Sequence, residues 1–442
     1  MKTLQFIIIR TTMMATVLLL SSVMIAQVAD NTLSLGIKSV TRGELRYGGF
    51  SNDSLKNERR ANFILGQCQL DLNYKRSSWL ELQISPKQTF VWGQGSGSLN
   101  LAEAWVHMKS DKGFFAKVGR QRLAYDDERI LGYDDWTMTA PTHDVLKLGY
   151  EGHHHKVHAL FAYNQNADNP DSGITYYANG LQPHKSMQTL WYHYDTPKSL
   201  YGISLLFMNI GMQNGDQEHP LIYYQQLVGT YMSLKPKHWS LEGAFYYQMG
   251  KQEDGITLDA FMGSAKAKFT PSDTYSVYAG YDYLSGDKYF AVPPGGQIGM
   301  VHHDKIRGFN PIYGSHHDFY GSMVFFYLNN YVGNFTPGLQ NVYIGGTVNP
   351  LKSMSIEAAY HYYAIATDLD YVDTKGLGHG FDISATYSLS NIAKLSTGYS
   401  YMLGTETMEV LQHWSENRKM HWAWLMLTVT PKLYSTTWQD KN

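Results

Sequence analysis

The chain has 442 residues and a formal net charge of −2, and charged residues make up 17% of it, less than the roughly 25% of ordinary soluble proteins. This balance gives no support for nucleic acid or an anionic lipid surface as a partner. The chain also contains 34 tyrosines, 10 tryptophans and 40 glycines, and aromatic side chains in such excess suit the interfaces of a membrane.

Residues 1–26 follow the order of a secretory signal peptide, with Lys2 and Arg10, then an apolar run, then the small residue Ala26. A membrane anchor is the alternative, but the apolar run is shorter than the ~18–20 residues that a spanning helix needs. We therefore expect cleavage near Ala26. Cleavage removes two of the 36 basic residues and none of the 38 acidic ones, which leaves a formal charge of −4.

Alternating polarity follows the presumed signal peptide. In residues 33–47, Leu33, Leu35, Ile37 and Leu45 share one parity, and the opposite parity carries the charged residues Lys38, Arg42, Glu44 and Arg46. In a strand these two sets point to opposite faces. Cys68, the only cysteine, alternates with Leu70 and Leu72, so it is expected to face lipid and cannot form an intrachain disulfide. Two later segments repeat the pattern, with Glu357 and His361 in one and Asp382 in the other.

A soluble β-sandwich also alternates, so the spacing of the turns decides the fold. Short polar connections recur near residues 75–78, 110–113, 151–155, 195–198, 235–238, 270–273, 350–352 and 390–393. Between them lie longer connections near 48–59, 93–99, 122–142, 166–185, 211–221, 250–257, 285–338, 366–378 and 404–419. Eight turns and nine loops predict an all-β, transmembrane antiparallel barrel of about 18 strands, with periplasmic termini and long extracellular loops.

The run at 318–327, DFYGSMVFFY, resembles a nineteenth strand. A spanning strand here would put the turn near Pro350 on the wrong side of the membrane. We therefore expect the run to belong to a loop at 285–338 that packs on or into the lumen. Residues 27–442 are then a single barrel domain.

The segment GRQRLAYDDERILGYDDW at 119–136 resembles the alginate-export family of outer-membrane proteins. Further matches are RGELRY at 42–47, LAEAWV at 101–106, HDVLKLGYE at 143–151, FNPIYGSHHDFYG at 309–321 and GFDISATYSLSNIAKLSTGYSY at 380–401. The resemblance covers nearly the whole mature chain. It implies an eighteen-stranded porin-like barrel in the outer membrane of a Gram-negative bacterium, with membrane lipid and the barrel-assembly machinery as partners. The name-giving member conducts an anionic uronic-acid polymer.

The charges of 119–136 suggest a constriction, because arginine presents a planar fork that binds carboxylates and anionic sugars alike. The alternative is that these residues bind one another and pin the loop to the wall. Likewise, the charges of 38–46 form either a ladder that favours anions or a polar lining without preference. The residues predicted to line the pore are Lys38, Arg42, Glu44, Arg46, Glu103, Arg120, Arg122, Asp126, Asp127, Arg129, Asp135, Trp136 and Asp144.

Other chemistries find little support in the sequence. The histidines at 153–155, 302–303 and 316–317 are sequence neighbours, which point apart in strands, so we expect no metal site and no cofactor. The carboxylates Asp126, Asp127 and Glu128 show no spacing typical of a glycosidase, and no catalytic motif is present. We expect a channel for hydrophilic, anionic, saccharide-like solutes rather than an enzyme. The alternative is a plugged barrel whose loops bind surface glycans or partner proteins.

Overall fold

The protein is described by a computed structural model that covers residues 30–48, 60–138, 141–165, 176–177, 180–252, 255–288, 305–328, 331–369, 373–412 and 419–439. The predicted signal peptide at 1–26 lies outside these residues. No helix in the described part of the chain is both long and apolar enough to cross a membrane.

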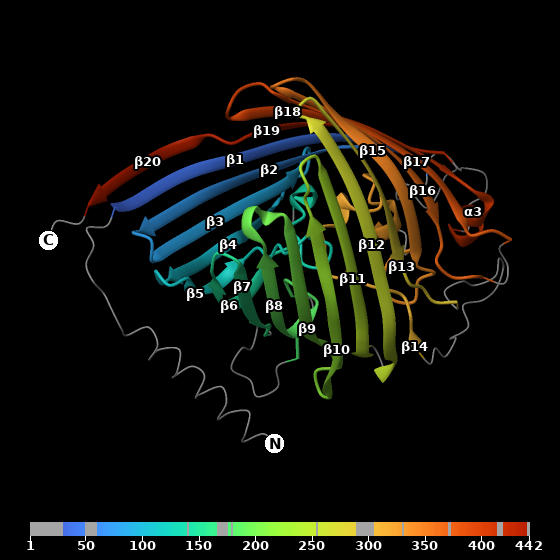
Figure 1. The fold of residues 1–442 in the computed structure, drawn as a ribbon, viewed down its shortest axis with the longest axis horizontal. Helices are drawn as coiled ribbons and strands as arrows, with labels where there is room; N and C mark the ends of the chain where they lie inside the picture. The colour runs from blue at the N-terminus through green and yellow to red at the C-terminus, as the bar shows by residue number, and fades with distance from the viewer. Residues whose placement is uncertain are drawn as a thin grey trace.

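Antiparallel strands form almost the whole structure (Figure 1). The strands are β1 (Asp30–Tyr47), β2 (Arg60–Arg76), β3 (Leu80–Val91), β4 (Ser98–Lys109), β5 (Phe114–Gln121), β6 (His143–Glu151), β7 (His155–Tyr163), β8 (His184–Asp195), β9 (Tyr201–Gly215), β10 (Pro220–Leu234), β11 (Trp239–Lys251), β12 (Thr257–Ser272), β13 (Tyr275–Leu284), β14 (Lys305–Ile306), β15 (Leu339–Leu351), β16 (Met354–Ala364), β17 (Gly376–Ser388), β18 (Ala393–Gly404), β19 (Lys419–Val429) and β20 (Lys432–Gln439). The short helices are α2 (Phe325–Leu328) and α3 (Glu406–Gln412), with 3-10 turns at Asp135–Thr137, Pro197–Ser199 and His316–Asp318.

The sheet closes on itself through β1. One edge of β1 pairs with β2, and the other pairs with both β19 and β20. Pro431 separates β19 from β20, because proline has no N–H to donate to a ladder, so these two segments form one wall strand. The two-residue β14 belongs to a loop. The described residues therefore form a closed barrel of 18 strands, which confirms the predicted fold class.

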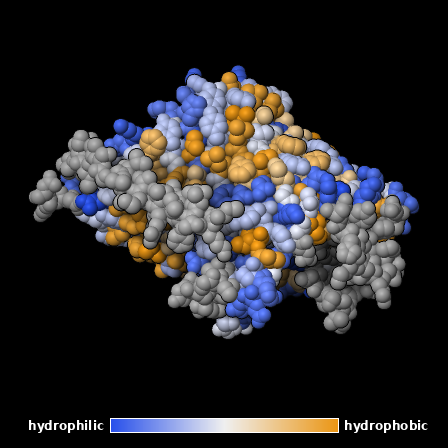
Figure 2. All heavy atoms as spheres, turned by 90° about the horizontal axis from the view of Figure 1, so that it is seen from below, coloured by the Kyte–Doolittle hydropathy of each residue, from blue (hydrophilic) through white to orange (hydrophobic). Residues whose placement is uncertain are grey.

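Polarity separates the two faces of the wall. Ile344 on β15 and Leu425 on β19 are 58% and 55% exposed, whereas Glu44 on β1 and Asp282 on β13 are each 2% exposed. Cys68 is exposed beside Leu70 and Leu72, on the outer face as predicted. Hydrophobic patches lie between hydrophilic regions on the face seen in Figure 2. The outer face suits lipid, and the inner face is polar.

The connections alternate in length as expected, with two differences. The connection predicted at 250–257 is only five residues long (252–256), because β11 continues to Lys251 and β12 begins at Thr257. The connection predicted at 211–221 is only four residues long, because β9 and β10 remain paired up to Gly215 and Pro220. By contrast, the loops at 122–142 and 285–338 have the predicted bounds. The short-turn end also holds the start of β1 and the end of β20, where Asp30 pairs with Gln439.

The loop between β13 and β15 folds against inward-facing side chains of the wall. Its residues 318–327 contain no strand and end in α2. Phe325 and Phe326 are each 1% exposed, and the ring of Phe326 lies 4.4 Å from that of Tyr363 on β16. The loop also contributes Phe309 and Tyr313 to a buried cluster that includes Leu123 and Leu131 of the 122–142 loop. Two loops thus share one hydrophobic core inside the barrel.

Candidate functional site: the lumen and its two inner loops

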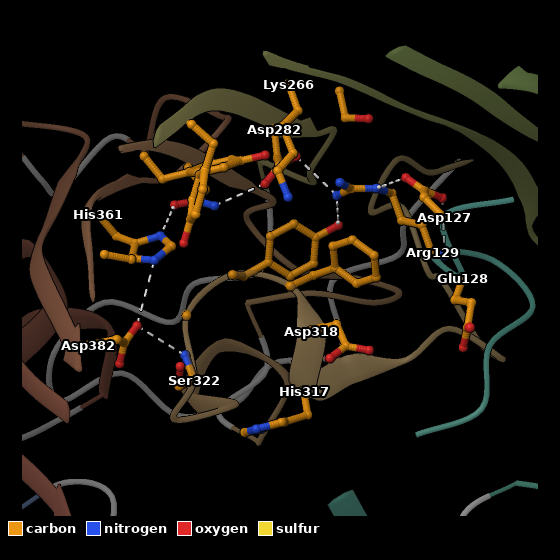
Figure 3. A pocket seen from close by; sticks show the side chains of 18 of the residues that line it. Asp127, Glu128, Arg129, Lys266, Asp282, His317, Asp318, Ser322, His361 and Asp382 are labelled. Carbon is orange, nitrogen blue, oxygen red and sulfur yellow. Dashed lines mark hydrogen bonds and ion pairs between the residues drawn. The ribbon is translucent and has the colours of Figure 1, made fainter. Parts of the chain in front are cut away.

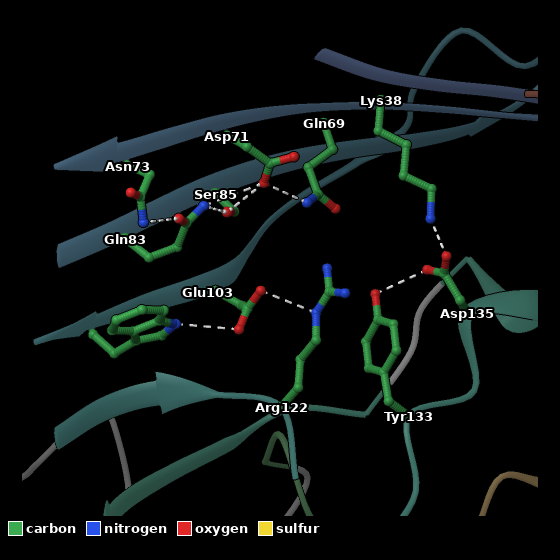
Figure 4. A network of polar contacts seen from close by, with 11 residues as sticks. Lys38, Gln69, Asp71, Asn73, Gln83, Ser85, Glu103, Arg122, Tyr133 and Asp135 are labelled. Atoms are coloured by element: carbon green, nitrogen blue, oxygen red, sulfur yellow. Dashed lines mark hydrogen bonds and ion pairs between the residues drawn. The ribbon is translucent and has the colours of Figure 1, made fainter. Parts of the chain in front are cut away.

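The tip of the 122–142 loop contacts the wall formed by β1–β4 through charged groups (Figure 4). Asp135 accepts from Nζ of Lys38 and from the hydroxyl of Tyr133. Burial acts to raise the pKa of Asp135, but the hydrogen bond and charge of Lys38 bring that pKa below its usual value. Arg122 Nε lies 3.0 Å from Glu103 Oε2. The predicted site residues Lys38, Glu103, Arg122 and Asp135 therefore form ion pairs on the inner face.

The predicted ladder on β1 is a compact, internally paired cluster. The carboxylate of Glu44 is fully buried and binds Arg42 at 2.9 Å and Arg46 at 2.8 Å. Trp422 Nε1 also donates to Glu44 at 3.0 Å. The guanidinium of Arg42 stacks on Trp136 at 3.8 Å and donates to its carbonyl at 2.6 Å. Arg42 thus fixes the loop to the wall, and Arg46, with a 26% exposed side chain, is the more accessible cation of the pair.

Arg129 connects both inner loops to the wall (Figure 3). Its side chain is 5% exposed and lies 3.1 Å from Asp127 and 3.0 Å from Asp282 of β13. Its guanidinium donates to the hydroxyl of Tyr320 at 3.3 Å and lies 4.1 Å from the ring of Phe319. Burial acts to lower the pKa of Arg129, but Asp282, Tyr320 and Asp127 together raise it well above the usual value.

The neighbouring carboxylate of Asp126 is held separately. It accepts from Trp191 Nε1 at 3.2 Å and from the hydroxyl of Ser204. Burial raises the pKa of Asp126 above its usual value. Both Asp126 and Glu128 have positive φ angles, 56° and 63°, a conformation that non-glycine residues adopt at a cost. The ion pairs and hydrogen bonds of this turn stabilise that backbone.

Two predicted site residues do not line the lumen. Arg120 and Asp144 are direct cross-strand partners and form an ion pair at 2.8 Å. Arg120 and Asp144 lie on the same face of the sheet as Val118, which is 45% exposed. Their sequence neighbours Gln121 and His143, on the other face, are each 1% exposed. Since adjacent strand residues point to opposite faces, the pair lies on the outer face. The prediction that Arg120 and Asp144 line the pore is therefore wrong.

Two inward lysines on this part of the wall were not predicted. Lys117 and Lys147 are direct partners across β5 and β6. Lys117 Nζ lies 3.6 Å from the Trp105 ring centroid, and Lys147 Nζ lies 5.1 Å from that of Tyr125. Neither lysine has an ion-pair partner among the described residues. The alternation of FFAKVGR and HDVLKLG was the signal that places both on the lumen side.

A second sector of the lumen contains a chamber of about 550 Å³ (Figure 3). Eight carboxylates line it, against the two cations Arg129 and Lys266. The carboxylates are Asp126, Asp127, Glu128, Glu242, Asp282, Asp318, Glu357 and Asp382. The sequence placed Glu357 and Asp382 on the lumen face, but it missed the chamber because the lining comes from loops and strands far apart in the chain.

The described ranges contain no cluster of three or more His, Cys, Asp or Glu side chains that is suited to a metal ion. His316 and His317 are instead occupied by ring stacking. The His317 ring lies 4.1 Å from that of Trp136, and His316 stacks on Tyr327 at 3.9 Å. Burial, followed by the charge of Arg42, lowers the pKa of His317 to about 3.

The apolar outer face, the closed sheet and the polar lumen with inner loops define an outer-membrane channel. Solved structures agree with that fold. Pseudomonas aeruginosa OccK2 (OpdF) in complex with glucuronate has a TM-score of 0.61 at 13% identity, covering 91% of this chain and 98% of that one. Acinetobacter baumannii OccAB1 has a TM-score of 0.60 at 11% identity, covering 91% and 97%. At such identities the likeness shows the fold alone.

A family profile described as Alginate export matches residues 95–400. The chain belongs to the alginate-export family, and its place is the outer membrane of a Gram-negative bacterium. Comparison with curated protein sequences gives no match.

Proposed function

We propose that this outer-membrane channel passes anionic, saccharide-like solutes and that Lys117 and Lys147 attract them. The observation that carries the proposal is the direct cross-strand pairing of these two lysines on the inner face, without a carboxylate partner in the described part of the chain. Like charges directly opposite each other destabilise a sheet. A bound solute of opposite charge would offset the repulsion between the two lysines, and pores lined by cations favour anions.

The neighbouring charges support the same path. Arg122 lies within electrostatic range of Lys117, and its side chain is 29% exposed. Lys38 and Arg46 are also partly exposed, at 20% and 26%. The solved structure of OccK2 in complex with glucuronate is a barrel of similar fold, and glucuronate has the anionic sugar chemistry proposed here.

The test is the reversal potential in a salt gradient for the double variant Lys117→Gln, Lys147→Gln. We expect its selectivity to shift from anions toward cations, and the shift to grow at low salt, where the Debye length exceeds ~10 Å. Arg120→Gln is the matched control. Because it removes one cation from the outer face, we expect it to leave the selectivity unchanged. An unchanged reversal potential in the double variant would contradict the anionic path.

A second candidate function follows from the shared core of the two inner loops. Leu123, Tyr125, Phe309 and Phe325 are all buried inside the barrel, so a lumen closed by these loops, with outer loops that bind surface glycans or partner proteins, is the competing proposal. A barrel that is inserted and folded but electrically silent would favour it.

A further inference from the structure

We propose that the carboxylate-lined chamber binds an amino sugar, a hydroxyl-rich saccharide unit that carries a free ammonium group. The inference extends the proposed function to a second class of saccharide at a different sector of the lumen, and it rests on that lumen being open to solutes. Three features of the chamber carry it: its charge, its size and its aromatic lining.

The charge of the chamber disfavours acidic ligands. Eight carboxylates face two cations in its lining, and Arg129 is already engaged by Asp127 and Asp282. Lys266 Nζ lies 4.9 Å from the ring of Tyr278 and forms no ion pair with a described carboxylate. His317 adds no positive charge at neutral pH, because burial lowers its pKa to about 3. The unbalanced negative charge favours a cation.

Two carboxylates are accessible for binding. Glu357 and Asp318 line the chamber and are both exposed; Glu357 comes from β16, and Asp318 comes from the loop between β13 and β15. Glu357 Oε1 accepts from Tyr278 at 2.7 Å, and Asp318 Oδ2 accepts from Ser315 at 2.5 Å. Among the described residues, the second oxygen of each carboxylate has no hydrogen-bond donor and can accept from an ammonium or hydroxyl group. Such charge-assisted hydrogen bonds are the strong ones.

The size and lining indicate an organic cation instead of a metal ion. A volume of about 550 Å³ lies within the ~300–1,000 Å³ typical of small-molecule pockets, and no cluster with metal-ligand geometry occurs among the described residues. Trp424, Phe319 and Tyr343 line the chamber and are partly exposed. Aromatic faces attract ammonium groups and offer flat apolar surfaces to a sugar ring. His317 also lines the chamber, and its Nδ1 has no hydrogen-bond partner in the described part of the chain.

Isothermal titration calorimetry on the full-length barrel in detergent tests the proposal, with the disaccharide of glucosamine and its N-acetylated counterpart as probes. The two share a sugar backbone, but only the first carries ammonium groups. We expect the glucosamine disaccharide to bind at least about tenfold more tightly, the factor that corresponds to one charge-assisted hydrogen bond. Equal affinities, no binding of either probe, or tighter binding of a uronic-acid disaccharide would each overturn the proposal.

The variants Glu357→Gln and Asp318→Asn should each weaken binding of the glucosamine disaccharide by about tenfold. Asp111→Asn, in the exposed turn between β4 and β5, is the control and should bind as the parent does. Full affinity in both chamber variants would overturn the assignment of the site. Calorimetry does not depend on conduction. Binding of the glucosamine disaccharide by a barrel without conductance would contradict the proposed channel but support the proposed binding site. Conductance without binding would support the channel and overturn the binding site.

Discussion

Three arginines of one short segment occupy three different environments. Arg120 lies on the outer face with Asp144, Arg122 faces the lumen with Glu103, and Arg129 is buried between Asp127 and Asp282. The sequence predicted a charged cluster at this loop, and most of its members do form ion pairs with one another or with the wall. It did not separate the roles, because parity assigns a face only while the chain remains in a strand, and Arg122 and Arg129 lie beyond the end of β5.

Removal of Arg129 should destabilise the loops strongly. We expect Arg129→Ala to cost ~3–5 kcal/mol, because it leaves the buried carboxylate of Asp282 without its counter-charge. The measurement is the temperature at which the barrel loses its heat-modifiable mobility on gels. Arg120→Gln, which breaks an exposed pair, should cost no more than ~1 kcal/mol. Similar losses in the two variants would show that Arg129 does not tie the loops to the wall.

The stacked ring of His317 makes the loop packing sensitive to acid. In the folded state the pKa of His317 is lowered to about 3, whereas an unfolded histidine titrates near 6.5. Between these values the unfolded state binds more protons, so stability falls as the pH is lowered from about 6.5 toward 3. At pH 5 this difference in pKa lowers the free energy of unfolding by ~2 kcal/mol relative to its value above pH 7. Unfolding temperatures of the parent and of His317→Phe, measured from pH 7 to pH 4.5, should show a shallower slope in the variant; parallel slopes would contradict this role.

At the scale of elements, alternation and turn spacing determine which side of each strand meets lipid. On β15, Ile344 is 58% exposed and lies on the outer face, whereas Glu357 on β16 lines the chamber inside the barrel. The same parity explains why Glu357, His361 and Asp382 were assigned correctly to the inner face. The inner loops were harder, because their buried residues follow no strand period and owe their positions to contacts with distant strands.

Cysteine labelling tests the face assignment directly. In a Cys68→Ala background, Ile344→Cys should react only with lipid-soluble thiol reagents, because it projects from the outer wall. Glu357→Cys should react with aqueous reagents that enter the lumen. Reaction of Ile344→Cys with the aqueous reagent, together with protection of Glu357→Cys, would reverse the assigned faces.

At the scale of the whole molecule, the count of 18 strands could be predicted because an even number keeps both ends of the chain on the short-turn side. The run at 318–327 would have broken that rule as a strand, and the structure has it as turns and the short helix α2. The chamber could not be predicted in the same way. Its lining joins Asp127, Asp282, Asp318 and Asp382, which approach one another only when the barrel closes and both loops fold inward.

Single-channel recording of the purified protein in planar bilayers tests the central claim, that this barrel is a channel with a solute path beside its inner loops. We predict steady conductance steps, and a larger step after deletion of residues 318–327, because that run occupies interior space without contributing a wall strand. Heat-modifiable mobility on gels verifies that both proteins are folded. A folded, inserted barrel that carries no current, before and after the deletion, would contradict the account.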